Sequence, residues 1–155
     1  MNQNGDHERE YEHDQHKQPI FSYPGSITTT SNGNIHVLDA VSGARGKVAV
    51  LGQGGDIINT YTGDREINKD IQFYPGDIVT TPRDNVIVAD PSTNTLHILN
   101  NADLPMAFYK TSDINIKYQL SLAFSPTGQL YIGCNRSSHG TKKDAKIYEV
   151  TISGC

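Results

Sequence analysis

Short apolar stretches alternate with turn-forming residues from residue 20 to the end of the chain. The stretches at residues 34–39, 85–90 and 130–134 are rich in Val, Ile and Leu. Each comes just after a segment rich in Gly, Pro, Asn, Asp, Ser or Thr. Apolar runs of this length between turn formers predict β-strands rather than helices. Their nearly continuous apolar character indicates burial between neighbouring sheets.

This pattern recurs along the chain. Residues 23–29 (YPGSITT) return 51 residues later as residues 74–80 (YPGDIVT), and a third copy begins at Tyr118, 44 residues after the second. The offset is constant inside the apolar stretches and changes only between them, so the stretches are the structural elements and the variable segments are loops. In the second copy we expect strands at residues 77–81, 85–90, 95–99 and 106–109.

Four short strands per unit and a period of 44 to 51 residues are typical of β-propeller blades. The sequence therefore predicts an all-β fold with about three four-stranded blades, the last of them without its fourth strand. The predicted blades cover approximately residues 20–62, 72–109 and 118–152. Two faces of such an arc would be apolar and uncovered, which predicts self-association or, as we favour from sequence, further blades in a longer chain.

The first 19 residues differ in composition from the rest. They carry several carboxylates and histidines with almost no apolar side chains, so the sequence predicts a disordered tail at residues 1–19 and a propeller segment at residues 20–155. Residues 1–10 lack the apolar core of a signal peptide, and no apolar run approaches the about 20 residues of a membrane helix. We therefore expect a soluble, cytoplasmic protein with no membrane partner.

The second unit resembles an NHL repeat in residues 75–78 (PGDI), 86–90 (VIVAD) and 96–99 (LHIL). The chain from residue 20 onward is similar to the C-terminal part of tripartite-motif NHL proteins, particularly those of bivalve molluscs. Segments that carry this likeness are residues 51–63 (LGQGGDIINTYTG), 80–90 (TTPRDNVIVAD) and 128–134 (GQLYIGC). The resemblance implies a six-bladed propeller of which this chain is a part.

The resemblance implies a protein-interaction module that recruits substrates for a tripartite-motif-like E3 ubiquitin ligase, or a stand-alone relative of such a module. The RING domain, B-boxes and coiled coil of that family have no counterpart in the sequence. We therefore expect no catalytic residue and no enzymatic activity in this chain, and a protein as its partner. An RNA-binding propeller is the alternative, and a lyase or hydrolase of the same fold with a channel metal is a third reading.

Candidate chemistry in the repeats has structural explanations. Residues 52–55 (GQGG) lack the helix and the Gly-Lys-Ser/Thr of a phosphate-binding loop, so a hairpin turn is expected there. His36 and His97 lie in predicted strands as structural histidines, and Asp39 and Asp90 end strands where they would cap the following turn. No cofactor or metal is expected.

Basic residues gather in the loops that would open on one face of a propeller. A basic face is typical of proteins with an anionic partner, although carboxylates are interleaved there, and solvated loops are the simpler interpretation. Tyr61, Tyr109 and Tyr118 flank the same loops, and their recurrence suggests packing rather than base stacking. The predicted partner-binding residues are Arg45, Lys47, Arg65, Lys69, Lys110, Lys117, Arg136, Lys142 and Lys143.

Overall fold

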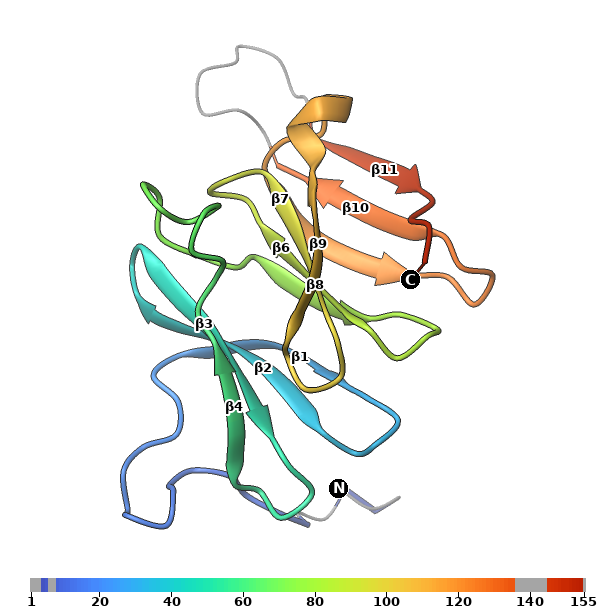
Figure 1. The fold of residues 1–155 in the computed structure, drawn as a ribbon. Helices are drawn as coiled ribbons and strands as arrows, with labels where there is room; N and C mark the ends of the chain where they lie inside the picture. The colour runs from blue at the N-terminus through green and yellow to red at the C-terminus, as the bar shows by residue number, and fades with distance from the viewer. Residues whose placement is uncertain (1–3, 6–7, 136–144, 155) are drawn as a thin grey trace.

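Three antiparallel β-sheets make up the fold in the computed structural model (Figure 1), which describes residues 4–5, 8–135 and 145–154. Sheet 1 consists of β1 (Pro24–Thr29), β2 (Ile35–Ser42), β3 (Arg45–Leu51) and β4 (Ile57–Tyr61). Sheet 2 consists of β5 (Asp77–Thr80), β6 (Val86–Asp90), β7 (Thr95–Leu99) and β8 (Pro105–Lys110), followed by a 3-10 helix, η1 (Thr111–Ile114). Sheet 3 consists of β9 (Gln119–Phe124), β10 (Leu130–Cys134) and β11 (Lys146–Val150).

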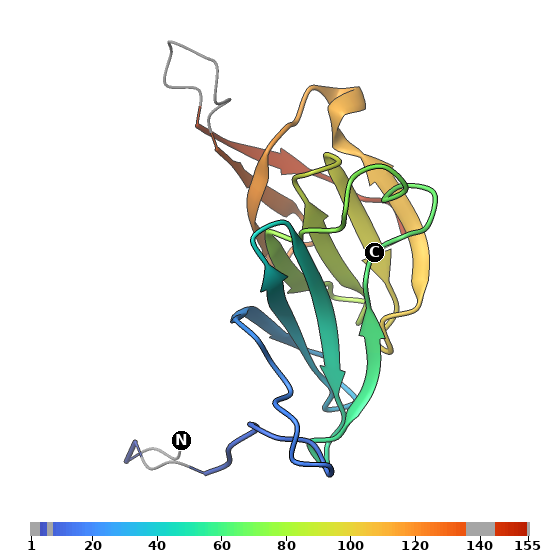
Figure 2. The same cartoon turned by 90° about the vertical axis from the view of Figure 1, so that its left-hand side faces the viewer.

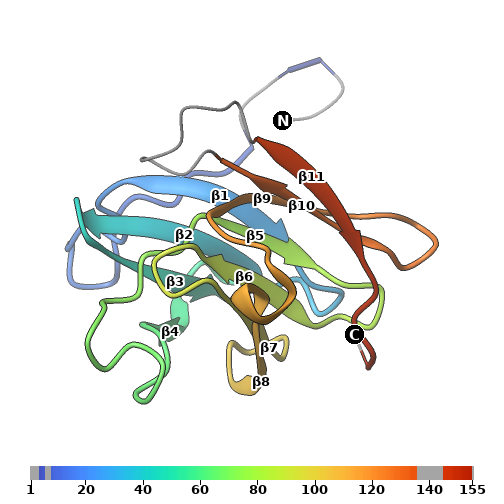
Figure 3. The ribbon, with the colours of Figure 1, turned by 90° about the horizontal axis from the view of Figure 1, so that it is seen from above.

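Within each sheet the strands follow one another in chain order, so every connection inside a sheet is a hairpin. The first strands of the three sheets, β1, β5 and β9, contact one another in turn and lie side by side in Figure 3. The prediction of an all-β fold of four-stranded repeats is confirmed for sheets 1 and 2. Sheet 3 has three strands among the described residues, as the sequence also indicated.

Sheets 1 and 2 are joined by a buried apolar layer. Leu38 and Val48 of sheet 1 pack with Val86 and Val88 of sheet 2, and Phe73 of the β4–β5 connector closes the layer. Successive side chains of a strand point to opposite faces. The neighbours of Val88 in sequence therefore face sheet 3.

Sheets 2 and 3 share a second apolar layer. Ile87 and Ala89 of β6 pack with Leu130 and Ile132 of β10. Ile87 and Ile132 have no exposed surface, as expected for the strand between its two sheet neighbours. The near-continuous apolar character of β6 is thus explained by its central position, with one apolar layer on each side.

The segment before β1 lies along the side of sheet 1 that faces away from sheet 2 (Figure 2). The Arg9 guanidinium donates to the carbonyl of Gln53 at 2.9 Å, and the Lys47 ammonium donates to the carbonyl of Ile20 at 3.4 Å. Ile20 itself is buried. Disorder of residues 1–19 in solution stays a prediction, as does the cytoplasmic location. Among the helices that the structure describes, none is long and apolar enough to span a membrane.

Candidate functional site

One end of all three sheets carries the long connections. Because antiparallel strands alternate in direction, the β2–β3 and β6–β7 turns open at the same end as the β4–β5 and β8–β9 connectors. We call this end the loop face. In Figure 1 the β4–β5 connector (green), the β6–β7 turn and η1 all lie toward the upper end of the molecule. The β5–β6 turn, which holds Arg83, lies at the opposite end.

The structure places the predicted binding residues that it describes on the loop face. Arg65 and Lys69 lie in the β4–β5 connector, Lys117 lies in the β8–β9 connector, and all three are exposed. Arg45 begins β3 and Lys110 ends β8, and both are exposed as well. The remaining predicted residues, Arg136, Lys142 and Lys143, lie outside the described residues.

Lys47 differs from the other cations because its charge is compensated inside the protein. Its ammonium lies 3.5 Å from Oδ2 of Asp39, whose side chain is fully buried. Asp39 also accepts hydrogen bonds from the backbone N–H groups of Ser22 and Tyr23, at 2.7 to 3.0 Å. Asp39 therefore caps the chain entering β1, and the prediction that it caps the turn after its own strand is wrong.

The carboxylates of the loop face are partly withdrawn from its surface. Asp64 accepts hydrogen bonds from the N–H groups of Glu66 and Ile67 at 2.9 and 3.0 Å, so it caps the turn at residues 65–68. Asp39 and Asp90 are fully buried. Among the described residues of this face, exposed cations consequently outnumber exposed carboxylates, which favours contact with an anionic group.

A hollow of about 490 Å³ lies on the loop face between sheet 1 and the β4–β5 connector. Its lining combines Arg45 and Lys47 with the polar side chains of Thr62 and Gln72, and Phe73 forms its apolar part. Within the described part of the chain, the Arg45 guanidinium makes no hydrogen bond or ion pair. A guanidinium without a partner beside an apolar wall can bind a carboxylate or a phosphate with two parallel hydrogen bonds.

A buried polar cluster around Asp90 holds the β4–β5 connector in place beneath this hollow. Asp90 Oδ2 accepts from Asn68 Nδ2 at 2.9 Å and from Thr93 Oγ1 at 2.8 Å, while Oδ1 accepts from the N–H of Ser92 at 3.1 Å and from its hydroxyl. The prediction that Asp90 caps the following turn is confirmed. Burial by itself raises the pKa of Asp90, but nearby His97 and these hydrogen bonds outweigh it, so the pKa lies below its usual range.

His97 connects the Asp90 cluster to Tyr61. The Tyr61 hydroxyl lies 2.8 Å from His97 Nδ1, whereas His97 Nε2 lies 3.7 Å from Asp90 Oδ2, beyond hydrogen-bond range. The rings of Phe73 and Phe108 meet the imidazole edge-on, each with its centroid 5.2 Å away. Burial raises the pKa of the Tyr61 hydroxyl, so this group stays protonated at neutral pH. The expectation of a structural histidine at position 97 is confirmed.

Replacing Tyr61 with Phe should lower the free energy of unfolding by about 1 to 2 kcal/mol, because His97 Nδ1 would be left buried without a partner. Chemical denaturation at neutral pH measures the loss. Tyr109 occupies the equivalent repeat position in β8 but is 42% exposed, so Tyr109→Phe is the matched control and should change little. If both substitutions lower the free energy of unfolding equally, the buried hydroxyl of Tyr61 makes no specific contribution to stability.

The tyrosines around the loop face divide into two groups. Tyr61 is buried, as the packing prediction required, with 7% of its surface exposed. That prediction is wrong for Tyr109 and Tyr118, because each keeps about two fifths of its surface exposed. Tyr23, which precedes β1, is 75% exposed. The repeat places these rings at recurrent positions along the chain, but burial depends on the neighbours of each ring, and Tyr61 packs with Phe73 and His97 at the junction of sheets 1 and 2.

The other residues considered for chemistry have structural roles. His36 Nδ1 lies 2.9 Å from Asp103 Oδ1, and both side chains are fully buried between sheets 1 and 2. Burial raises the pKa of Asp103 even though the adjacent imidazole lowers it. Gly52 and Gly55 close the β3–β4 hairpin turn through a 2.9 Å backbone hydrogen bond, as expected. In the part of the chain that the structure describes, no group of three His, Cys, Asp or Glu side chains could hold a metal ion.

No family model matches the chain, and no curated protein matches its sequence. Solved structures with a similar fold include a luciferin-regenerating enzyme, with a TM-score of 0.60 and 14% identity over 88% of this chain and 47% of that one. A protein of unknown function from Bacteroides caccae has a TM-score of 0.58 and 18% identity, over 81% of this chain and 44% of that one. A catalytically inactive variant of virginiamycin B lyase from Staphylococcus aureus, solved with quinupristin, has a TM-score of 0.53 and 14% identity, over 86% of this chain and 42% of that one.

These likenesses define the fold as propeller-like, and the chain spans less than half the length of the structures it matches. They also correct one prediction made from the sequence. The sequence predicted no enzymatic activity in this chain, yet two of the similar structures are named as enzymes. The expectation of a non-catalytic chain is therefore withdrawn. At identities of 14% the likeness concerns the fold and assigns no reaction to this chain.

Proposed function

We propose that this chain is part of an NHL-type propeller and that it binds a protein partner through the loop face. In a tripartite-motif-like protein, such a propeller recruits the substrate of a ubiquitin ligase whose RING lies in another domain. Support for the NHL type comes from the repeated residues at 75–78, 86–90 and 96–99, and from sheets whose strands follow one another in chain order.

The observation that carries the proposal is the Arg45 guanidinium, which has no partner among the described residues, at the hollow beside the β4–β5 connector. Arg and Tyr are enriched among the residues that contribute most to protein–protein binding, because they combine apolar area with specific hydrogen bonds. Arg65 and Lys69 extend the positive charge from this hollow across the connector. An acidic surface or segment of a partner protein fits this arrangement.

Single-stranded RNA is the second candidate, and the exposed tyrosines favour it. Tyr23 and Tyr118 each come just before the first strand of a sheet and present exposed rings at the loop face. Aromatic rings beside cations are the usual elements of single-strand binding, since bases stack on the rings while phosphates pair with the cations. The alternative RNA-binding function therefore rests on an observation of its own.

Reversing the charges of Arg45, Arg65 and Lys69 together, each to Glu, should weaken partner binding at least about tenfold without lowering the melting temperature, because all three side chains are exposed. Arg83→Glu, on the opposite face, is the matched control. Partners captured by cross-linking in cell extracts are quantified for wild type and both variants by mass spectrometry.

An oligouridylate of 12 nucleotides, titrated by fluorescence anisotropy at two salt concentrations, tests the RNA alternative. Salt-dependent binding that the triple variant loses and Tyr23→Ala weakens would favour RNA. If the triple variant still binds the same protein partners and still binds oligouridylate, the loop face is not the binding surface.

A further inference from the structure

Sheet 3 ends on an unpaired strand. In sheets 1 and 2 the third strand is covered by a fourth, β4 or β8, but the outer edge of β11 has no pairing strand among the described residues. Such an edge presents a row of backbone N–H and C=O groups ready to pair with another strand. The two complete sheets show what that strand should look like, since β4 and β8 occupy the same position in their repeats.

The segment at residues 9–14 has the sequence features of the end of a fourth strand. Tyr11 and Asp14 repeat the spacing of Tyr61 and Asp64 at an offset of 50, close to the offset of 51 that relates Tyr23 to Tyr74. The two aspartates also have the same role. Asp14 Oδ1 accepts from two backbone N–H groups, at 2.8 and 2.9 Å, as Asp64 Oδ1 does at 2.9 and 3.0 Å.

The same segment contacts sheet 1 in the way that β4 contacts sheet 2. Asn59 of β4 donates to the carbonyl of Ala102, in the β7–β8 turn of the next sheet, at 2.6 Å. Arg9 donates to the carbonyl of Gln53, in the equivalent β3–β4 turn of sheet 1, at 2.9 Å. The segment therefore already has the neighbour that a fourth strand needs on one side. Among the described residues, however, the segment is not paired with any sheet as a strand.

We propose that residues 8–12 pair with β11 of a second copy as the fourth strand of its sheet 3, so that two copies close into one ring. Each copy gives this strand at one junction and receives it at the other. The chain covers 42 to 47% of each similar structure, so two copies together match about the length of one. This assignment is an alternative to the sequence-based expectation of a disordered tail at residues 1–19 with further blades in a longer chain.

The repeat also fixes the register of the proposed pairing. In sheet 1, Val48 pairs with Tyr61 and Val50 with Asn59, and in sheet 2, Leu96 pairs with Tyr109 and Ile98 with Ala107. Both registers, carried over to β11 by the repeat, place Tyr11 opposite Ile147 and Arg9 opposite Glu149. Arg9 and Glu149 are exposed and of opposite charge. A cross-strand pair of opposite charges stabilises an antiparallel junction.

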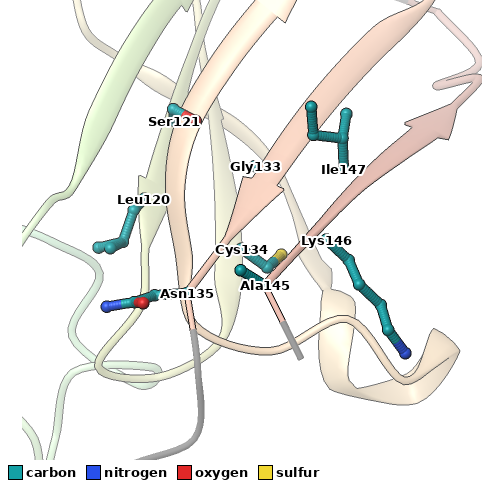
Figure 4. Close-up of a pocket in the computed structure, with 8 residues that line it drawn as sticks. All are labelled: Leu120, Ser121, Gly133, Cys134, Asn135, Ala145, Lys146 and Ile147. Atoms are coloured by element: carbon teal, nitrogen blue, oxygen red, sulfur yellow. The ribbon is translucent and has the colours of Figure 1, made fainter. Parts of the chain in front are cut away.

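The outer face of sheet 3 exposes two large apolar side chains where sheet 1 of the second copy would lie. Figure 4 shows Leu120 and Ile147 on the strands to either side of Gly133, around a hollow of about 380 Å³. Ile147 is 78% exposed and Leu120 47%. The segment before β1 and strand β11 lie at opposite ends of the molecule in Figures 1 and 2, so one copy cannot make this junction with itself.

Cysteine trapping in the full chain tests the junction. With Cys155→Ser as background, Arg9→Cys combined with Glu149→Cys should form disulfides between chains under mild oxidation, because directly opposed residues lie within disulfide range. Light scattering should show twice the mass of one chain. Glu149→Cys with Arg83→Cys is the control and should not link. A monomer at every concentration, a disulfide within one chain, or a dimer without the Arg9–Glu149 link would overturn the proposal.

A charge swap separates the pairing from the contact of Arg9 with its own sheet 1. Arg9→Glu or Glu149→Arg should each weaken dimerisation about tenfold, since a repulsive pair arises at both junctions of the ring. The double variant should restore it. If Arg9 acts only through Gln53 of its own chain, Glu149→Arg will not rescue Arg9→Glu, and the proposed register is wrong.

Discussion

Replacement of Ile87 by Asp is expected to unfold the chain at room temperature. Ile87 has no exposed surface and sits between sheets 2 and 3, packed with Leu130 and Ile132. The described residues that pack around it in this cluster are apolar, so the new carboxylate would be buried among apolar side chains, at a cost of several kcal/mol or more. Domains of this size have a free energy of unfolding of about 5 to 15 kcal/mol, so one such substitution removes most or all of that stability.

Circular dichroism and a thermal melt measure this outcome. The matched control is Ile58→Asp, which places the same new charge on β4, where the Ile58 side chain is 54% exposed. The control should melt within a few degrees of wild type. If Ile87→Asp also melts like wild type, the apolar layer between sheets 2 and 3 does not hold the fold together.

Asp90→Asn is expected to lower the free energy of unfolding by about 3 kcal/mol. The two carboxylate oxygens accept from Asn68, Thr93 and Ser92 in a site with no exposed surface. An amide of the same shape offers only one acceptor oxygen, and its NH₂ group would face donors that it cannot satisfy. Urea denaturation measures the change. Asp70→Asn, on the exposed part of the β4–β5 connector, is the control and should be neutral.

The pH dependence of stability gives a second measurement on the same variant. The pKa of Asp90 is lower in the folded chain than in the unfolded one, so its ionised form stabilises the fold above the unfolded value near about 4. That contribution is lost as pH falls through the lower, folded pKa. Asp103 acts in the opposite direction, since its raised pKa makes the ionised form costly in the folded state. Asp90→Asn should therefore flatten the fall in stability at acid pH, and an unchanged slope would contradict the role given to Asp90.

The strands could be predicted from sequence because their signal is local. In the second unit the expected strands at residues 77–81, 85–90, 95–99 and 106–109 agree with β5 to β8 within one residue at each end. Apolar runs between turn formers determine where a strand begins and ends, and the repeat supplies three readings of the same pattern. The antiparallel, sequential order of each sheet follows from the short turns.

The site was less predictable because its contacts join distant parts of the chain. The pairing of Tyr61 with His97 joins two sheets, so it depends on which faces meet, and local pattern does not encode that. Recurrence of tyrosines suggested packing, yet exposure depends on whether a further strand covers each ring. The contact of Arg9 with Gln53 was not predicted, because composition alone does not show that a polar side chain hydrogen-bonds to a distant turn.

The two junctions between sheets differ in chemistry, and this difference determines which repeats can pack against each other. Sheets 1 and 2 bury two histidine pairs, His36 with Asp103 and Tyr61 with His97, whereas the core layer between sheets 2 and 3 is apolar and its buried polar contact, Gln119 with Thr111, lies outside that cluster. Similar repeats can pair in the wrong order during folding, which is a characteristic failure of repeat proteins. A misordered neighbour would leave these polar groups buried and unpaired, so the polar junction disfavours such arrangements and fixes the order in which the similar units assemble.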